Sequence, residues 1–188
     1  MEHTRRLDMS NQDIKRIGIL TGGGDCPGIN AVIRAVAKTA MLEHEWSCFG
    51  IEDGFLGLIE DHVHPLARAD VSNILTRGGT ILGTSNKANP ERFASGRDEQ
   101  GHVIWKDVRD RVMATYQKYG LDAVVVIGGD GTMTCAASMI PMGMRCVGVP
   151  KTMSGQMGTA ANEALAFVAK LKAAITCPVV TWDERLTT

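Results

Sequence analysis

Short apolar runs rich in β-branched residues alternate along the chain with longer segments in which apolar residues recur at helical spacing. The clearest strand is DAVVVIGG at residues 122–129, which is apolar throughout, as in a parallel sheet that is covered on both faces. Further strands are predicted for RIGILT at 16–21, WSCFGI at 46–51, HVHPL at 62–66 and MRCVGVP at 144–150.

Helical periodicity is found in PGINAVIRAVAKTAML at 27–42, VIWKDVRDRVMATYQKYG at 103–120 and ANEALAFVAKLKAAI at 161–175. The last of these precedes another apolar strand, CPVVTW at 177–182. Strands that alternate with helices predict an α/β doubly wound fold with right-handed crossovers. We therefore expect a mostly parallel sheet in a Rossmann-like three-layer sandwich.

Composition narrows the class of protein. A chain of 188 residues can bury one core, or one and a half, and its 20 Lys and Arg against 21 Asp and Glu give a net charge of −1. Such a balance provides no global basic field for nucleic acid or for an anionic membrane, so neither is an expected partner. The five cysteines show no CxxC spacing, and neither a disulfide framework nor a zinc site is expected.

Neither the start of the chain nor its apolar runs carry a targeting signal. No run approaches the roughly 18 residues that span a bilayer, and MEHTRRLDMSNQD lacks the apolar centre of a signal peptide. We therefore predict a cytoplasmic protein in which residues 1–15 form a mobile tail.

Two glycine-rich turns follow directly on predicted strands: TGGGDCPG at 21–28 and GGDGT at 128–132. In an open parallel sheet such turns lie at the carboxyl edge, where ligands bind near a switch point. Consecutive glycines let backbone N–H groups converge on an anion, and the helix that follows adds the positive end of its dipole. Each turn alone is equally consistent with a simple tight turn, but two equivalent turns, each with an aspartate, favour a phosphate site.

The aspartate of the second turn, Asp130, has a further interpretation. A carboxylate beside bound phosphates repels them unless a metal intervenes, and Mg²⁺ takes one or two carboxylates together with phosphates and water. Asp130 is therefore a candidate Mg²⁺ ligand. Neither turn is a Walker A motif, because GK[ST] does not follow, and TGGGDCPG does not fit the dinucleotide pattern GxGxxG.

Four segments together carry a resemblance to a known family: IGILTGGGDCPGINAVIRAV, DGFLGLIE, RGGTILGTSNKANP and VVVIGGDGT. In order and spacing they are similar to the amino-terminal domain of the 6-phosphofructokinases, over about residues 16–150. GGDGT alone also resembles NAD kinases and diacylglycerol kinases. The resemblance implies a glycolytic transferase that moves the γ-phosphoryl of ATP to fructose 6-phosphate, with ATP and Mg²⁺ as cofactors, and that forms homo-oligomers.

The resemblance also implies roles for individual residues. The positions that match the family's nucleotide-phosphate contacts are Gly23, Gly129, Gly131 and Thr132, and Asp130 matches its Mg²⁺ ligand. Lys87 falls near the basic residue that reaches the phosphates. Pyrophosphate-using members carry an aspartate where this chain has Gly131, so the glycine favours ATP. Lys151 favours the other donor, since the pyrophosphate type has a lysine there, and the donor is left open between ATP and pyrophosphate.

The catalytic segment departs from the family pattern. The family strand that ends in GVPKT or GLPGT continues into TIDND, whose first aspartate accepts the proton of the sugar hydroxyl. Here Ser154 stands at that position, after Lys151 and Thr152, and these three are the catalytic candidates. A serine is no general base by itself, and base catalysis is typically worth ~10² to 10⁴ in rate. We therefore expect Mg-ATP binding with little turnover, in a fold that is incomplete relative to the full family fold.

A second resemblance begins at about residue 147. GVPKTMSGQMG, the predicted helix and CPVVTWDERLTT are similar to the central part of the YqgF (RuvX) family of RNase H-like nucleases over 147–188. Asp183 and Glu184 match that family's middle acidic motif, although metal-dependent hydrolysis needs further carboxylates. This predicts a kinase-like domain at 16–148 and a YqgF-like segment at 149–188. There are two alternatives to a kinase. One is a nuclease that acts on Holliday junctions or ribosomal RNA precursors, and the other is a non-catalytic nucleotide-binding hybrid.

Overall fold

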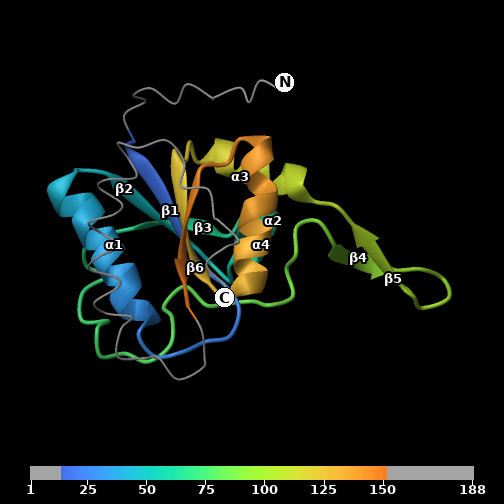
Figure 1. The fold of residues 1–188 in the computed structure, drawn as a ribbon, viewed down its shortest axis with the longest axis horizontal. Helices are drawn as coiled ribbons and strands as arrows, with labels where there is room; N and C mark the ends of the chain where they lie inside the picture. Colours follow the sequence, from blue (N-terminus) through green and yellow to red (C-terminus); the bar gives the residue numbers. More distant parts are fainter. Residues whose placement is uncertain (1–13, 152–188) are drawn as a thin grey trace, which may run out of the picture.

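A five-stranded sheet is the centre of residues 14–151, which are the residues that the computed structural model describes (Figure 1). Its strand order is β3-β2-β1-β6-β7. The strands are β1 (Arg16–Thr21), β2 (Ser47–Ile51), β3 (Val63–Leu66), β6 (Ala123–Gly128) and β7 (Cys146–Pro150). All neighbours pair in parallel except β2 and β3, which are antiparallel. All five predicted strands in this part of the chain are confirmed.

Helices cover both faces of the sheet. They are α1 (Ile29–Glu43), α2 (Phe55–Glu60), α3 (Arg109–Lys118) and α4 (Asp130–Met139), and a short 3-10 turn, η1 (Ile140–Met142), follows α4. In Figure 1, α1 lies on one side of the sheet and α2, α3 and α4 lie on the other. Two hydrophobic clusters, one on each face, hold these layers together. The predicted doubly wound, mostly parallel three-layer fold is confirmed.

The central strands are buried on both faces. On β1, Ile19 packs in the cluster under α1, whereas the next residue, Leu20, packs in the cluster under the other helices, and both are 0% exposed. On β6, Val125 and Val126 divide between the two clusters in the same way. Because successive strand residues face opposite sides, a strand covered on both faces is apolar without interruption.

The order of the strands places a switch point beside β1. The chain runs from β1 through α1 to β2 on one side of β1, and β6 later pairs with its other side. The turns that follow β1 and β6 therefore lie next to each other at the carboxyl edge of the sheet, where open α/β sheets bind ligands.

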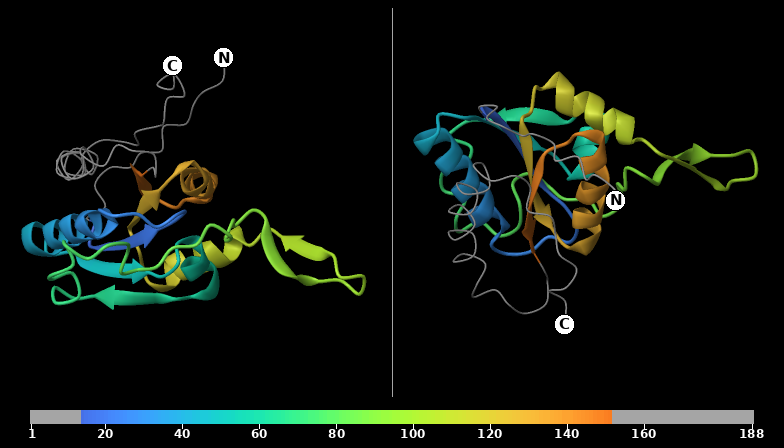
Figure 2. Two further views of the ribbon diagram at one scale, coloured as in Figure 1. Left: turned by 90° about the horizontal axis from the view of Figure 1, so that it is seen from below. Right: turned by 45° about the horizontal axis from the view of Figure 1, so that its top comes forward.

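One predicted helix is wrong over its first third. Within 103–120, the structure forms strand β5 (Val103–Lys106), and α3 begins only at Arg109. The β-branched and aromatic residues of β5 pair in antiparallel fashion with β4 (Phe93–Arg97), a strand that the sequence analysis did not predict. The two strands form an arm that projects from the rest of the molecule in every view (Figures 1 and 2).

The described part of the chain begins at Ile14 and ends at Lys151. Ile14 packs in the core and Lys15 donates its N–H to the Asp122 carboxylate, so residues just before the predicted strand also belong to the fold. Residues 1–13 of the predicted tail, the helix at 161–175 and the strand at 177–182 lie outside the described residues. Between residues 14 and 151, no helix has both the length and the apolar character that a membrane span requires.

The cysteines of the described part are free thiols: Cys26, Cys48, Cys135 and Cys146. Burial raises the pKa of Cys48 to about 12 and that of Cys146 to about 11. These two thiols are therefore protonated near neutral pH.

Candidate phosphate-binding site

The second glycine turn joins β6 to the amino terminus of α4. Gly129 is the N-cap residue, in extended conformation with φ −88°, and no side chain caps the helix. The N–H groups of the first helical turn have no partner within a helix, and the helix dipole adds partial positive charge at this end. Asp130 and Gly131 are exposed there. The geometry is that of an anion-binding helix terminus with a carboxylate at its rim.

Thr132 joins the two glycine turns by packing. Its side chain is 8% exposed and lies between Gly22 and Gly128. A Cβ added to Gly22 would be 2.6 Å from the Thr132 hydroxyl oxygen, and a Cβ added to Gly128 would be 2.6 Å from the Thr132 Cβ. Gly22 also donates its N–H to the Ile127 carbonyl oxygen at 2.9 Å. Gly22 and Gly128 therefore provide room for Thr132, a role that was not predicted from the sequence.

The first glycine turn is held by the loop that carries Lys87. Gly23, with φ +79°, donates its N–H to the Ser85 carbonyl oxygen at 3.3 Å, and the Thr84 hydroxyl donates to the Gly23 carbonyl oxygen at 2.5 Å. Lys87 follows two residues later and is exposed. Lys87 and Gly23 are far apart in sequence, but the contacts of Thr84 and Ser85 with Gly23 place the backbone of Lys87 near the first glycine turn.

Lys151, just after β7, reaches both turns. Its N–H donates to the Gly128 carbonyl oxygen at 2.9 Å, and its ammonium group donates to the Gly24 carbonyl oxygen. Three strand ends, those of β1, β6 and β7, therefore meet at one edge. The other two catalytic candidates, Thr152 and Ser154, lie outside the described residues.

Asp130 is a candidate metal ligand, whereas Gly131 next to it has open space at the position of a Cβ. Among residues 14–151 no group of three or more His, Cys, Asp or Glu side chains gathers in a way that could hold a metal ion. Asp130 fits Mg²⁺ only in the manner that this ion commonly adopts, as one carboxylate beside phosphate oxygens and water. A Cβ added to Gly131 would meet nothing within 4 Å, so the described structure has no steric need for glycine there.

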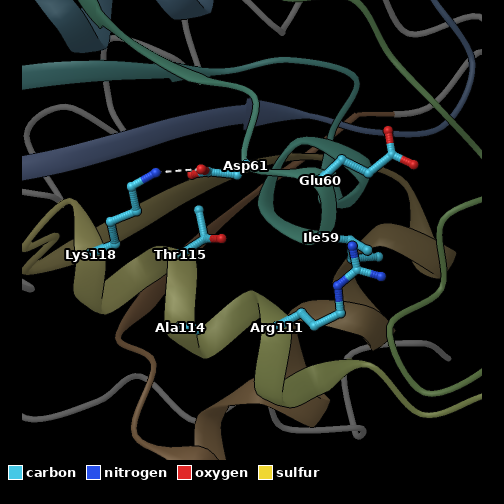
Figure 3. Close-up of a pocket in the computed structure, with 7 residues that line it drawn as sticks. All are labelled: Ile59, Glu60, Asp61, Arg111, Ala114, Thr115 and Lys118. Carbon is cyan, nitrogen blue, oxygen red and sulfur yellow. Dashed lines mark hydrogen bonds and ion pairs between the residues drawn. The ribbon is translucent and has the colours of Figure 1, made fainter.

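A separate surface hollow of about 320 Å³ lies between α2 and α3 (Figure 3). Its charged lining residues are Glu60, Asp61, Arg111 and Lys118. Lys118 donates a hydrogen bond to Asp61, and this bond lowers the pKa of the Asp61 carboxyl below its usual value. None of the residues predicted to bind phosphate lines the hollow, which is distinct from the glycine turns.

Comparison with known proteins agrees with the first resemblance. The family model described as Phosphofructokinase matches residues 16–171. ATP-dependent 6-phosphofructokinase 2 of Clostridium perfringens is 48% identical over 146 residues, which are 78% of this chain and 40% of that protein. ATP-dependent 6-phosphofructokinase of Edwardsiella ictaluri is 42% identical over 144 residues, or 77% of this chain and 41% of that protein. The chain spans about two fifths of the length of these curated relatives.

Solved structures show the same fold. Phosphofructokinase from Saccharomyces cerevisiae has a TM-score of 0.57 and 26% identity, over 86% of this chain and 24% of that one. Pyrophosphate-dependent phosphofructokinase from Marinobacter aquaeolei has a TM-score of 0.56 and 18% identity, over 74% of this chain and 34% of that one, a likeness of fold alone.

The family match also bears on the predicted join. It continues through residue 171, well past the strand at which the second resemblance begins, and these comparisons give the YqgF resemblance no support. The match covers most of the chain, and its two glycine turns meet at the carboxyl edge of the sheet: the chain belongs to the phosphofructokinase family.

Proposed function

We propose that this chain binds Mg-ATP at the two glycine turns and is the nucleotide half of an ATP-dependent 6-phosphofructokinase, which transfers a phosphoryl group to fructose 6-phosphate. The observation that carries the proposal is the meeting of both turns at the switch point, with the uncapped amino terminus of α4 open beside them. The names of the relatives support ATP as the donor.

Five of the predicted residues have a direct role in this proposal. The N–H groups around Gly23, Gly129 and Gly131 would bind phosphate oxygens, and Lys87 would add positive charge from the loop beside Gly23. Asp130 would hold Mg²⁺, which neutralises charge on the nucleotide phosphates when bound. Phosphoryl transfer depends mainly on positioning and on stabilisation of charge, so these groups would supply most of what the nucleotide side needs.

Donor choice is the finer part of the proposal. Gly131 leaves open space above the first turn of α4, and an aspartate there would bring a second carboxylate beside the phosphates. The open space at Gly131 supports ATP over pyrophosphate. Lys151, the feature shared with pyrophosphate-using members, donates from its ammonium group to the Gly24 carbonyl oxygen.

Turnover is the weaker activity in the proposal, because Ser154 stands where the family has its general base. We expect the chain to bind Mg-ATP, with Thr152 and Lys151 near the transferred group, and to phosphorylate fructose 6-phosphate at least ~10²-fold more slowly than with an aspartate in place. Restoring the carboxylate with Ser154→Asp should raise the rate if the rest of the acceptor site is present.

The test is Mg-ATP binding by isothermal titration calorimetry on the chain and on Asp130→Asn. We expect Asp130→Asn to lose the Mg²⁺ dependence of binding. Asp110→Asn is a matched control, because Asp110 also lies in the first turn of a ten-residue helix, α3, away from the glycine turns. Absence of Mg-ATP binding by the parent chain would contradict the proposal, as would equal effects of the two substitutions.

The segment at 149–188 stays a prediction. As a YqgF-like nuclease fragment it should cleave RNA or branched DNA in a metal-dependent reaction that Glu184→Gln abolishes. Sequencing the encoding DNA across the codons of residues 147–150 would show whether this segment belongs to the same gene. Cell fractionation would test the predicted cytoplasmic location. Light scattering would measure the molar mass in solution and so test the predicted homo-oligomer.

A further inference from the structure

Two of the four buried polar side chains in the described part of the chain point at the same loop. The four are Thr21, Asn30, Thr115 and Thr132, and the two least exposed, Thr21 at 0% and Asn30 at 1%, both hydrogen-bond to residues 77–83. A buried polar group is costly unless it is paired, so side chains of this kind define the geometry around them.

Asn30, at the start of α1, pairs through both ends of its amide. Its Nδ2 donates to the Arg77 carbonyl oxygen at 3.0 Å, and its Oδ1 accepts the Ile81 N–H at 2.8 Å. A single side chain from α1 therefore holds the loop at both ends of a five-residue turn. A leucine of similar volume would leave those backbone groups without their partners.

Thr21, at the end of β1, holds the next part of the loop. Its hydroxyl donates to the Gly83 carbonyl oxygen at 2.6 Å and lies 3.0 Å from the Thr80 hydroxyl, which also accepts the Leu82 N–H at 3.1 Å. The last residue of the strand thus fixes the position at which the loop turns toward the first glycine turn.

Two glycines of the loop are closely fitted as well. Gly79 and Gly83 have φ +74° and +68°, and a Cβ on either would lie 2.4 Å from a carboxylate oxygen, of Asp25 and Asp53 respectively. Asp53 also donates its N–H to the Leu82 carbonyl oxygen at 2.9 Å. The loop therefore has one closely defined path along the side of β1 and α1.

This path ends at the phosphate site. Directly after Gly83, Thr84 and Ser85 hydrogen-bond to the backbone of Gly23, and Lys87 follows. We propose that Thr21 and Asn30 form a buried clamp that fixes residues 77–87 against the first glycine turn, and that they are positioning residues through which Gly23 and Lys87 act on phosphate as one unit. The phosphate part of this inference rests on the proposed function.

The experiment uses the full chain with Asn30→Leu and Thr21→Val, of which Thr21→Val is the milder because threonine and valine have the same shape. Thr115→Val is the matched control: Thr115 is equally a buried threonine, at 6% exposure, but it lies on α3. The first measurement is amide hydrogen exchange of residues 77–87 without ligand. We expect faster exchange there in both clamp variants and no change in Thr115→Val.

The second measurement is the Mg-ATP dissociation constant, with and without Lys87→Met. Loss of one well-placed charged contact should raise it roughly tenfold. If the clamp acts through Lys87, then Lys87→Met will weaken binding in the parent chain and have much less effect in Asn30→Leu. A purely structural role would lower stability but leave the Lys87→Met effect unchanged.

The outcomes separate the two proposals. Unchanged exchange of residues 77–87 in both clamp variants would overturn the clamp, and additive effects of Asn30→Leu and Lys87→Met would overturn its positioning role. If the parent chain binds no Mg-ATP, the proposed function fails together with that positioning role, whereas hydrogen exchange still decides whether the clamp exists.

Discussion

The two glycine turns resemble each other in sequence but use glycine for different physical reasons. In the first turn, Gly23 and Gly28 have φ +79° and +96°, a region that disfavours residues with a Cβ, and no backbone atom comes close to the position of the Cβ. In the second turn, Gly128 has ordinary backbone angles, and glycine is required because Thr132 fills the space. One turn needs glycine for its dihedral angles and the other needs it for its volume.

Gly22 and Gly131 are the exceptions that make this comparison informative. Gly22 belongs to the first turn but, like Gly128, it is limited by Thr132. Gly131 belongs to the second turn but is limited neither by dihedral angle nor by a neighbour. A glycine-rich motif therefore contains residues with structural roles and, at Gly131, one that the described structure leaves free for a ligand.

The largest effect is expected at Gly128. In Gly128→Ala the new methyl group would meet the Thr132 Cβ, which is fixed to the backbone of α4, so β6 and α4 must move apart. We expect a loss near the upper end of the ~1–3 kcal/mol that overpacking costs. Urea denaturation measures it, and a midpoint equal to that of the parent chain would contradict the volume argument.

Gly22→Ala should destabilise the fold somewhat less than Gly128→Ala does. A second substitution, at Thr132, provides a control. Its closest contacts are the Thr132 Oγ1 and Cγ2 atoms, at 2.6 and 2.7 Å, which Thr132→Ala removes. Gly22→Ala should lower the free energy of unfolding by about 1–3 kcal/mol, and most of this loss should be recovered in the double variant Gly22→Ala with Thr132→Ala. Gly128→Ala should show no such recovery, because the Thr132 Cβ remains. If Thr132→Ala restored the same amount of stability to both glycine variants, the side chain of Thr132 would not explain the difference between Gly22 and Gly128.

Gly23→Ala should have a smaller effect with a different cause. Its Cβ would lie 3.8 Å from the Thr132 hydroxyl oxygen, an ordinary contact, so the cost is the left-handed backbone angle, about 1–2 kcal/mol. Gly23→Asn should cost less than Gly23→Ala because asparagine tolerates this region better than most residues do. Urea denaturation measures both variants. A lower denaturation midpoint for Gly23→Asn than for Gly23→Ala would indicate a steric rather than a conformational limit at this position.

Gly131→Ala should leave the fold intact and change binding instead. Alanine in the first turn of α4 meets open space and favours the helix by up to about 1 kcal/mol over glycine, so the melting temperature should stay the same or rise. Mg-ATP affinity should nevertheless fall, and Gly131→Asp should lower it further, as titration calorimetry will show. A destabilised Gly131→Ala would mean that this glycine serves the fold after all.

The sequence predicted the fold, but not the contacts that shape the candidate site. The apolar run of β6 and the spacing of α1 sufficed for the sheet and its layers, because burial on both faces leaves a direct record in hydrophobicity. The arm was missed because Val103, Ile104 and Trp105 fit a helical period as well as a strand. Their partner strand, β4, is polar and short, and pairing between strands is not visible from one strand alone.

For the candidate site, the two turns and their meeting could be predicted, but the contacts that shape them could not. The packing of Thr132 against Gly22 spans more than a hundred positions, and no local pattern encodes it. The loop at 77–87 belongs to one of the motifs that resemble the family, yet nothing in its own sequence shows that Asn30 holds it. Thr152 and Ser154 lie beyond the described residues, so their predicted roles stay predictions.

The central place of β1 has a consequence for the order in which the molecule assembles. Arg16 pairs with Ser47 across a short stretch of chain, whereas Ile17 must find Ala123 on β6, and the hydrogen bond from the Arg16 N–H to the Asp122 carboxylate closes a loop of 106 positions. Closing the longer loop costs more chain entropy before any contact is gained. The unit from β1 to β3 can therefore form early, and the two glycine turns come together only when β6 joins it, so we expect the candidate phosphate site to be complete only after the long loop has closed.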